Sequence, residues 1–294
     1  MTFGISTHLF HDERLSEAHL ALVKQHGFDR VEIFATRSHV DYTSDAAAGQ
    51  IATWLANNGL TLHSVHAPIT NALTRGAWGD VWSIASSNAA VRQTAVSEGR
   101  QAIAFASALG ARFVVVHLGV PDSMKPPAPD NDGGALARSL ETLAAEARAR
   151  RITLALEVIP NRLSTPDALA ARLEDAADAA EDPGDIAALG VCLDSGHAHM
   201  MGGAVDAIES LGGHIVTTHL HDNDAKQDDH RVPFQGTINW SALVMAMEKV
   251  GYDGVWMFEV AAPEGGAGVE QTLAKAAAAR DRLARLNEPI EFTL

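Results

Sequence analysis

The sequence predicts an α/β fold, a single closed (β/α)8 TIM barrel, and three observations lead to this fold class. Eight short β-type runs alternate with eight longer helical patterns over 294 residues. Most of the β-type runs are continuous apolar stretches, as expected for parallel strands that are buried on both faces. No linker or change in composition divides the chain, so residues 1–294 are expected to form one domain.

The expected strands are short apolar runs that end in a polar residue. They cover residues 4–9, 30–34, 60–65, 113–117, 152–158, 190–194, 215–220 and 254–260. A doubly wound sheet usually has fewer such units and often carries a glycine-rich turn after its first strand. The segment ISTHLFHDE, which begins in the first expected strand and continues past it, contains no glycine. This disfavours a doubly wound sheet.

The expected helices occupy the segments between these strands and are rich in alanine. They cover residues 16–26, 45–58, 91–109, 134–150, 166–180, 205–211, 240–250 and 268–286. Gly27, Gly59 and Gly110 follow three of them at the position where helices commonly end. Two long loops, residues 69–88 and 124–134, are expected over the same face of the barrel.

The charge and cysteine content exclude several function classes. The chain has 22 basic and 37 acidic residues, a formal net charge of −15, so nucleic acid and membrane surfaces are not expected as partners. The lone cysteine, Cys192, allows neither an intrachain disulfide nor a cysteine-based zinc site.

Because no apolar run reaches 18 residues and no signal-peptide pattern is present, a cytoplasmic protein is expected. Apolar surface on the alanine-rich helices could pair subunits into a homo-oligomer.

Side chains that can bind metal stand at the carboxyl end of every expected strand. In chain order they are His8, Glu32, His66, His117, Glu157, Asp194 with His197 three residues later, His219 with His221, and Glu259. Active sites of such barrels lie at this end of the strands. Burying several carboxylates together is unfavourable without a compensating cation. The pattern therefore predicts a catalytic divalent-metal site of nitrogen and oxygen ligands, suited to Mn²⁺, Zn²⁺, Co²⁺ or Fe²⁺.

Several positions near the end of the seventh strand allow two interpretations. His219 is the expected inward ligand, and His221, which has the same parity, is the alternative. Asp228 and His230 on the following loop could both reach one ion, or they could belong to an ordinary charged loop. Arg231 beside them could hold a phosphate, carboxylate or hydroxyl group of a substrate.

Other polar and aromatic residues are also open to two interpretations. His8 and Glu32 could line a substrate pocket, or they could act as a helix cap and a hydrogen-bond partner. Trp78 and Trp82 could cover the apolar face of a sugar, or they could pack within the barrel. The remaining histidines singled out fall on helix faces, loops or strand starts and are interpreted as solvated or structural: His11, His19, His26, His39, His63 and His214.

Short motifs that contain the strand-end residues occur along the whole chain, from GISTHLF to MFEV. They are VHAP, VVHLG, LEVIPN, CLDSGHAHMMG, HLHDND followed by DDH and GTINW, and MFEV. Together they resemble the xylose-isomerase-like barrels, the sugar phosphate isomerase/epimerase proteins that share a fold with endonuclease IV. The most specific parts of the resemblance are Asp-x-x-His at residues 194–197 and His-Leu-x-Asp-Asn at residues 219–223.

The resemblance implies which residues hold the cofactor. A divalent ion would be bound by Glu157, Asp194, His219 and Glu259, and the two glutamates would also be the catalytic acid/base pair. His197 matches a substrate or second-metal contact. In endonuclease IV further ligands complete a three-metal cluster, and the matching residues here are His66, His117, Asp228 and His230. The expected cofactor is Mn²⁺, Co²⁺, Zn²⁺ or Mg²⁺, with one ion expected and up to three permitted.

The expected function is a metal-dependent isomerase or epimerase of a sugar or sugar phosphate. It would transfer a proton next to a carbonyl through a metal-stabilised enediolate. A sugar lyase or dehydratase that uses the same site is one alternative. An endonuclease IV-like phosphodiesterase is another, but a duplex-binding face needs basic loops, and the loops of this chain are sparse in basic residues. The expected substrate contacts are His8, Glu32, His66, His197, Arg231 and Trp78.

Overall fold

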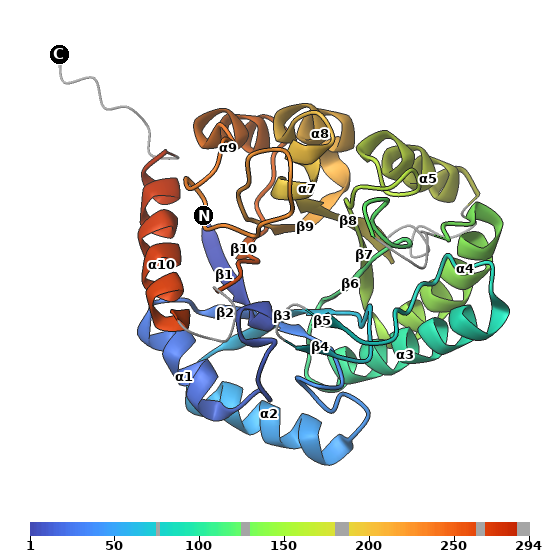
Figure 1. Cartoon of the computed structure of the whole chain (residues 1–294), viewed down its shortest axis with the longest axis horizontal. Helices are drawn as coiled ribbons and strands as arrows, with labels where there is room; N and C mark the ends of the chain where they lie inside the picture. Colours follow the sequence, from blue (N-terminus) through green and yellow to red (C-terminus); the bar gives the residue numbers. More distant parts are fainter. Residues whose placement is uncertain (75–76, 125–129, 180–187, 263–267, 287–294) are drawn as a thin grey trace.

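Eight parallel strands form the barrel in the computed structural model, which describes residues 1–74, 77–124, 130–179, 188–262 and 268–286 (Figure 1). In sheet order they are β10 (Val255–Phe258), β1 (Thr2–Ser6), β2 (Arg30–Phe34), β3 (Thr61–His66), β6 (Phe113–Val116), β7 (Thr153–Glu157), β8 (Leu189–Asp194) and β9 (Ile215–His219). A parallel bridge between Leu220 and Phe258 joins the two ends of this sheet. The predicted single-domain TIM-barrel fold class is confirmed.

A ring of helices surrounds the strands, as Figure 1 shows. Its members are α1 (Glu17–Gln25), α2 (Asp45–Asn57), α3 (Ala89–Ala108), α4 (Gly133–Arg150), α5 (Pro166–Ala179), α8 (Ala204–Leu211), α9 (Trp240–Lys249) and α10 (Val269–Leu286). Gly27, Gly59 and Gly110 adopt positive φ angles of 78°, 58° and 73° just beyond α1, α2 and α3, as expected for helix ends. Among the described residues, no helix combines the length and apolar character that spanning a membrane requires.

The predicted boundaries of the first strand were wrong. β1 covers Thr2–Ser6, and the 3-10 helix η1 (Thr7–Phe10) follows directly, where residues 4–9 were expected to be extended. The Ser6 side chain accepts a hydrogen bond from the backbone N–H of His8, and this local cap starts the helix. His8 therefore lies on η1, beyond the end of the strand.

The chain also forms elements that the hydrophobic pattern did not predict. The expected loop at residues 69–88 contains a short antiparallel pair, β4 (Leu73–Thr74) and β5 (Ala77–Trp78). A six-residue helix, α7 (Ser195–Met200), follows β8 immediately. The 3-10 helix η2 (Gly212–His214) precedes β9. Part of the expected loop 124–134, residues 125–129, and the last residue of the expected helix 166–180 lie outside the described residues.

The barrel interior changes from apolar to polar toward the carboxyl ends of the strands. Val115, Ala155 and Cys192 form a small buried cluster of their own, apart from the larger core between sheet and helices. Side chains two positions apart on a strand share a face. Glu157 and Asp194 therefore follow Ala155 and Cys192 on the same interior side, and both are fully buried. This alternation carries the polar strand ends toward the barrel axis.

Candidate metal centre at the barrel mouth

Four buried side chains meet at the carboxyl ends of β7, β8, β9 and β10. Glu157, Asp194, His219 and Glu259, the central cluster, each offer one ligand atom, and these atoms all lie within 4.8 Å of one another. His219 Nδ1 is 3.1 Å from Glu157 Oε1 and 3.4 Å from Glu259 Oε2. The sequence predicted that these four residues would converge, and the structure brings them together. Their role as metal ligands stays a prediction.

The charges of the central cluster are strongly coupled. Burial alone would raise the pKa of the Glu157 carboxyl, but the neighbouring His117 and His219 hold it well below its usual range. Burial alone would lower the pKa of His219, but nearby carboxylates, including Glu259 and Glu32, raise it well above its usual value. Positive charge at this point therefore stabilises the buried carboxylates. A divalent cation is suited to supply that charge in place of protons.

Glu32 lies behind His219 and fixes the direction of its ring. Its two oxygens are 3.0 and 3.1 Å from His219 Nε2, and Ser64 Oγ donates a hydrogen bond of 2.7 Å to Glu32 Oε2. With Nε2–H donated to Glu32, the Nδ1 atom of His219 is free to face the central cluster. Glu32 is fully buried, and it contacts His219 directly. Its contact with substrate stays a prediction.

His66 and His117 stand next to the central cluster on the side of β3 and β6. Their Nε2 atoms lie 3.1 and 3.0 Å from Glu157 Oε2, so the three side chains form a second candidate ligand group. His66 also belongs to a group with His219 and Glu259. His66 Nδ1 is hydrogen-bonded to the carbonyl of Ala67, which directs Nε2 to the interior. Glu157 is therefore shared by two groups.

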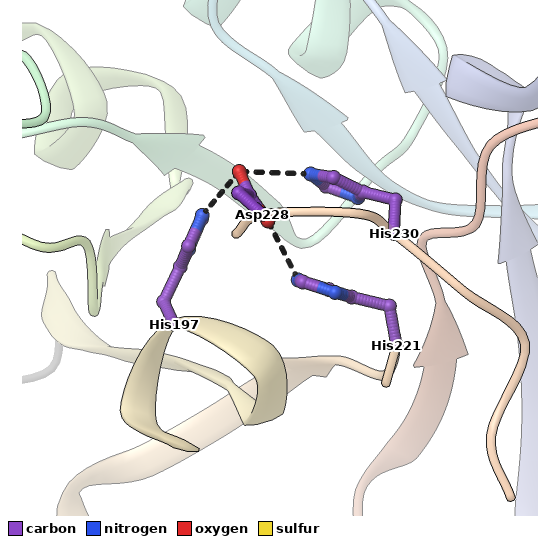
Figure 2. Close-up of side chains that lie close together, drawn as sticks. All are labelled: His197, His221, Asp228 and His230. Atoms are coloured by element: carbon purple, nitrogen blue, oxygen red, sulfur yellow. Dashed lines mark hydrogen bonds and ion pairs between the residues drawn. The ribbon is translucent and has the colours of Figure 1, made fainter. Parts of the chain in front are cut away.

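A further group lies beside Asp194 and consists of His197, His221, Asp228 and His230, the histidine-rich cluster (Figure 2). The Nε2 atoms of His197 and His230 are 3.1 and 3.3 Å from Asp228 Oδ2. His221 Nε2 is 3.8 Å from Asp228 Oδ1 and 2.9 Å from Asp194 Oδ1. His221 was expected only as an alternative to His219. Both point inward, and each belongs to a different cluster.

The histidine-rich cluster also has shifted pKa values. Burial alone would lower the pKa of His230, but the carboxylate of Asp228 raises it to about 10. The pKa of His197 is raised well above its usual value, because Asp194 and Asp228 outweigh the effect of burial. The pKa of Asp228 is correspondingly low. Imidazole and carboxylate groups therefore balance each other's charge here as well.

The other predicted substrate contacts lie around these clusters or beyond them. The His8 ring packs against Phe34 and His230, with ring centroids 4.9 and 5.0 Å apart, and burial lowers its pKa well below the usual value. Arg231 forms an ion pair of 2.5 Å with Asp229. Trp78 is 42% exposed on β5. The contact of these three residues with substrate stays a prediction.

Fold and strand-end residues together define a (β/α)8 barrel with a polar centre at its carboxyl-terminal mouth. The chain belongs to the xylose isomerase-like TIM barrel family, whose sequence model matches residues 20–287. The predicted resemblance to this family is thereby confirmed.

Curated relatives extend over most of the chain. The uncharacterized protein y4fM of Sinorhizobium fredii is 27% identical over 261 residues, which is 83% of this chain and 80% of that protein. The uncharacterized protein MJ1311 of Methanocaldococcus jannaschii is 28% identical over 270 residues, 88% of this chain and 83% of that protein.

Solved structures share the whole fold. A D-tagatose 3-epimerase-like protein has a TM-score of 0.73 and 24% identity, covering 97% of both chains. D-psicose 3-epimerase with D-tagatose from Clostridium cellulolyticum H10 has a TM-score of 0.72 and 19% identity, covering 98% of this chain and 100% of that chain. The IolI protein with a bound zinc atom has a TM-score of 0.73 and 18% identity, covering 96% and 98%.

Proposed function

We propose that this protein is a divalent-metal-dependent isomerase or epimerase that acts on a sugar or sugar phosphate. The observation that carries the proposal is the placement of Glu157 and Glu259. They come from different strands. Glu157 Oε1 and Glu259 Oε2 lie 3.1 and 3.4 Å from the same atom, Nδ1 of the buried His219. Two carboxylates beside one binding point are what a proton transfer between two positions of a substrate requires. Membership of the xylose isomerase-like family supports the same class of reaction.

The donor set of the central cluster fits a divalent ion. Three carboxylates and one imidazole nitrogen provide hard and borderline ligands, which suit Mn²⁺, Mg²⁺, Co²⁺ or Zn²⁺. Glu157, Asp194, His219 and Glu259 would hold the ion. When bound, it would supply Lewis-acid polarisation of the substrate carbonyl. The zinc atom in the similarly folded IolI structure supports a metal at such a barrel.

The protein's own residues would carry the proton transfer. One of the two glutamates would remove the proton from the carbon next to the carbonyl, and the other would return a proton. The Nε2 atoms of His66 and His117 lie 3.1 and 3.0 Å from Glu157 Oε2. These contacts would keep the carboxylate of Glu157 anionic and would fix its orientation. Return to the other face of the same carbon makes an epimerase, and return to the neighbouring carbon makes an isomerase. The structure of D-psicose 3-epimerase with D-tagatose, which has the same fold, supports a sugar substrate.

A second candidate function is metal-assisted hydrolysis of a phosphodiester. Three ligand groups besides the central cluster favour it, because such reactions commonly use more than one ion. One contains Glu157, one contains Asp228, and one joins His66 to His219 and Glu259. The net charge of −15 opposes binding of a nucleic acid, so we place this function second.

Proton exchange with solvent tests the first function directly. The metal-loaded protein is incubated in D₂O with a set of free and phosphorylated ketoses, and the products are followed by proton NMR. We expect deuterium to enter at a single sugar carbon, with exchange lost in Glu259→Gln while the circular dichroism spectrum is unchanged. Incision of abasic-site DNA without any exchange into the sugars would instead favour the second function.

A further inference from the structure

We propose that the amino-terminal end of the barrel, opposite the central and histidine-rich clusters, is a binding site for a small molecule that carries a phosphate group. A cavity of about 780 Å³, the amino-end cavity, lies there. The first residue of each of the eight barrel strands lines it: Thr2, Arg30, Thr61, Phe113, Thr153, Leu189, Ile215 and Val255. Barrel enzymes carry out their chemistry at the carboxyl-terminal end of the strands. The proposed sugar chemistry therefore does not use this cavity, and the site stands independently of it.

A β-bulge shapes the inner wall of the amino-end cavity. Successive residues of β2 pair with Leu62 and Ser64, so His63 is an extra residue on β3. Such bulges turn a side chain away from the regular alternation of a strand. His63 lines the cavity but is nine-tenths buried, and its Nε2 lies 3.0 Å from Thr217 Oγ1 on β9, four strands further around the barrel. This contact crosses the barrel interior, so it closes the cavity on the side of the central cluster.

Two arginines give the amino-end cavity positive charge. Arg30 Nη1 donates a hydrogen bond of 3.1 Å to Thr61 Oγ1. The Arg112 guanidinium lies over the Phe113 ring, 5.1 Å from its centroid, and the centroid of the same ring is 5.0 Å from that of His63. Among the described residues, no ion pair joins either arginine to a carboxylate. In a chain with a net charge of −15, two such arginines in one cavity indicate an anionic ligand.

The other charged groups of the amino-end cavity leave it with a positive balance. Burial lowers the pKa of His63 to about 4, so this ring is neutral near pH 7. The charges of Arg112 and Arg30 lower the same pKa, as expected for guanidinium groups close to the imidazole. Asp253 is the one carboxylate among the described residues that line the cavity. Two positive groups therefore stand against one negative group.

The groups around the amino-end cavity suit a phosphate group on a small molecule. Guanidinium groups bind phosphate through paired N–H donors, and hydroxyl groups add single hydrogen bonds. The arginines and the threonine hydroxyls come from several strands, which suits a tetrahedral anion better than a planar carboxylate. The volume is typical of small-molecule sites and exceeds that of phosphate alone. The rest of the ligand would contact the apolar lining residues Leu189, Ile215 and Val255.

Calorimetric titration of the metal-loaded protein with inorganic phosphate and with glycerol 2-phosphate tests the site. Arg30→Met and Arg112→Met keep a long side chain but lose the charge, so we expect each to weaken binding of both probes by at least about tenfold. Arg282→Met is the matched control, because Arg282 also lies over an aromatic ring, Phe234, but does not line the cavity. It should bind as the wild type does. Asp253→Asn should bind more tightly, because it removes a repelling charge.

Crystals soaked in tungstate, a phosphate analogue, locate the anion without any measurement of activity. We expect an anomalous peak between Arg30 and Arg112. If Arg30→Met fails to fold, Arg112→Met still tests the site, because Arg112 is exposed.

Four results would overturn the proposal: a tungstate peak only at the carboxyl-terminal mouth, no binding of either probe by the wild type, binding by both arginine variants equal to that of Arg282→Met, or tighter binding of succinate than of glycerol 2-phosphate. A failure of the sugar assay with the probes still bound at the amino end would affect only the proposed function.

Discussion

The carboxylate of Glu32 accepts a hydrogen bond from His219 Nε2 at 3.0 Å, on the side of the ring that faces away from Glu157. Ser64 Oγ in turn donates to Glu32 at 2.7 Å. Three neighbouring or facing strands, β2, β3 and β9, therefore determine the direction in which one candidate ligand points. A histidine oriented in this way binds a metal more tightly than a freely rotating one.

Replacing Glu32 tests this orientation. Glu32→Gln keeps the shape of the side chain but removes the charge that fixes the His219 tautomer. We expect the affinity of the stripped protein for Mn²⁺ to fall by about 10–100-fold, measured by calorimetric titration. Glu270→Gln, an exposed glutamate on α10, is the control and should bind as the wild type does. Equal affinities for the two variants would show that Glu32 does not orient a ligand.

A methyl group at Gly196 should disturb the histidine-rich cluster. In Gly196→Ala the added Cβ would overlap the His221 ring, so the ring or the helix must move. We expect a loss of about 1–3 kcal/mol in the free energy of unfolding, together with weaker zinc binding. Gly49→Ala is a matched helical control, because a Cβ there meets nothing within 4 Å. It should raise stability by about 0.5–1 kcal/mol, as alanine does in an exposed helix. A Gly196→Ala protein as stable as Gly49→Ala would contradict the packing of His221.

Two buried histidines outside the clusters should make the protein sensitive to acid. Burial lowers the pKa of both His39 and His63 to about 4, while an unfolded histidine titrates near 6.5. Between these values the unfolded chain binds more protons than the folded one, so stability should fall as the pH drops from 6.5 to about 4. Each histidine accounts for at most about 3 kcal/mol of this loss.

Denaturant titrations at several pH values measure this loss. His63→Gln retains a partner for Thr217 Oγ1, which lies 3.0 Å from His63 Nε2, and removes the titrating group. Its free energy of unfolding should therefore depend less steeply on pH between 6.5 and 4 than that of the wild type. Parallel curves for the two proteins would rule out His63 as a source of the acid sensitivity.

The single cysteine should be unreactive in the folded protein. Cys192 is fully buried on β8, and burial raises the pKa of its thiol well above the usual range. Only the thiolate reacts readily with disulfide reagents. We expect modification by such a reagent to be negligible in the native protein and complete in guanidinium. Rapid modification under native conditions would mean that the barrel interior opens.

The place of a polar side chain could be predicted from the sequence where it depends on a single buried strand. Glu157, Asp194 and His219 end apolar runs, and a parallel sheet brings such ends to one edge, so their convergence could be predicted. His8 was misplaced because a local hydrogen bond to Ser6 ends β1 early, and hydrophobicity does not record a side-chain cap. The β4–β5 pair has two-residue strands, too short for a periodic signal.

Contacts between distant segments were the part that the sequence could not give. His221 meets Asp228 only because α7 leaves room over Gly196, and no spacing within the chain encodes that space. The pairing of Arg231 with Asp229 likewise depends on how the loop after β9 folds back. His219 and His221 are two positions apart, so their side chains share a face of an extended segment. This spacing was the one indication in the sequence that both side chains would enter the barrel.

Anomalous diffraction from crystals soaked in Mn²⁺ shows whether the central cluster holds a divalent ion. We expect a manganese peak surrounded by Glu157, Asp194, His219 and Glu259, and its loss in crystals of Glu157→Gln. A map from well-ordered, Mn²⁺-saturated crystals that has no peak among these four side chains would contradict this expectation.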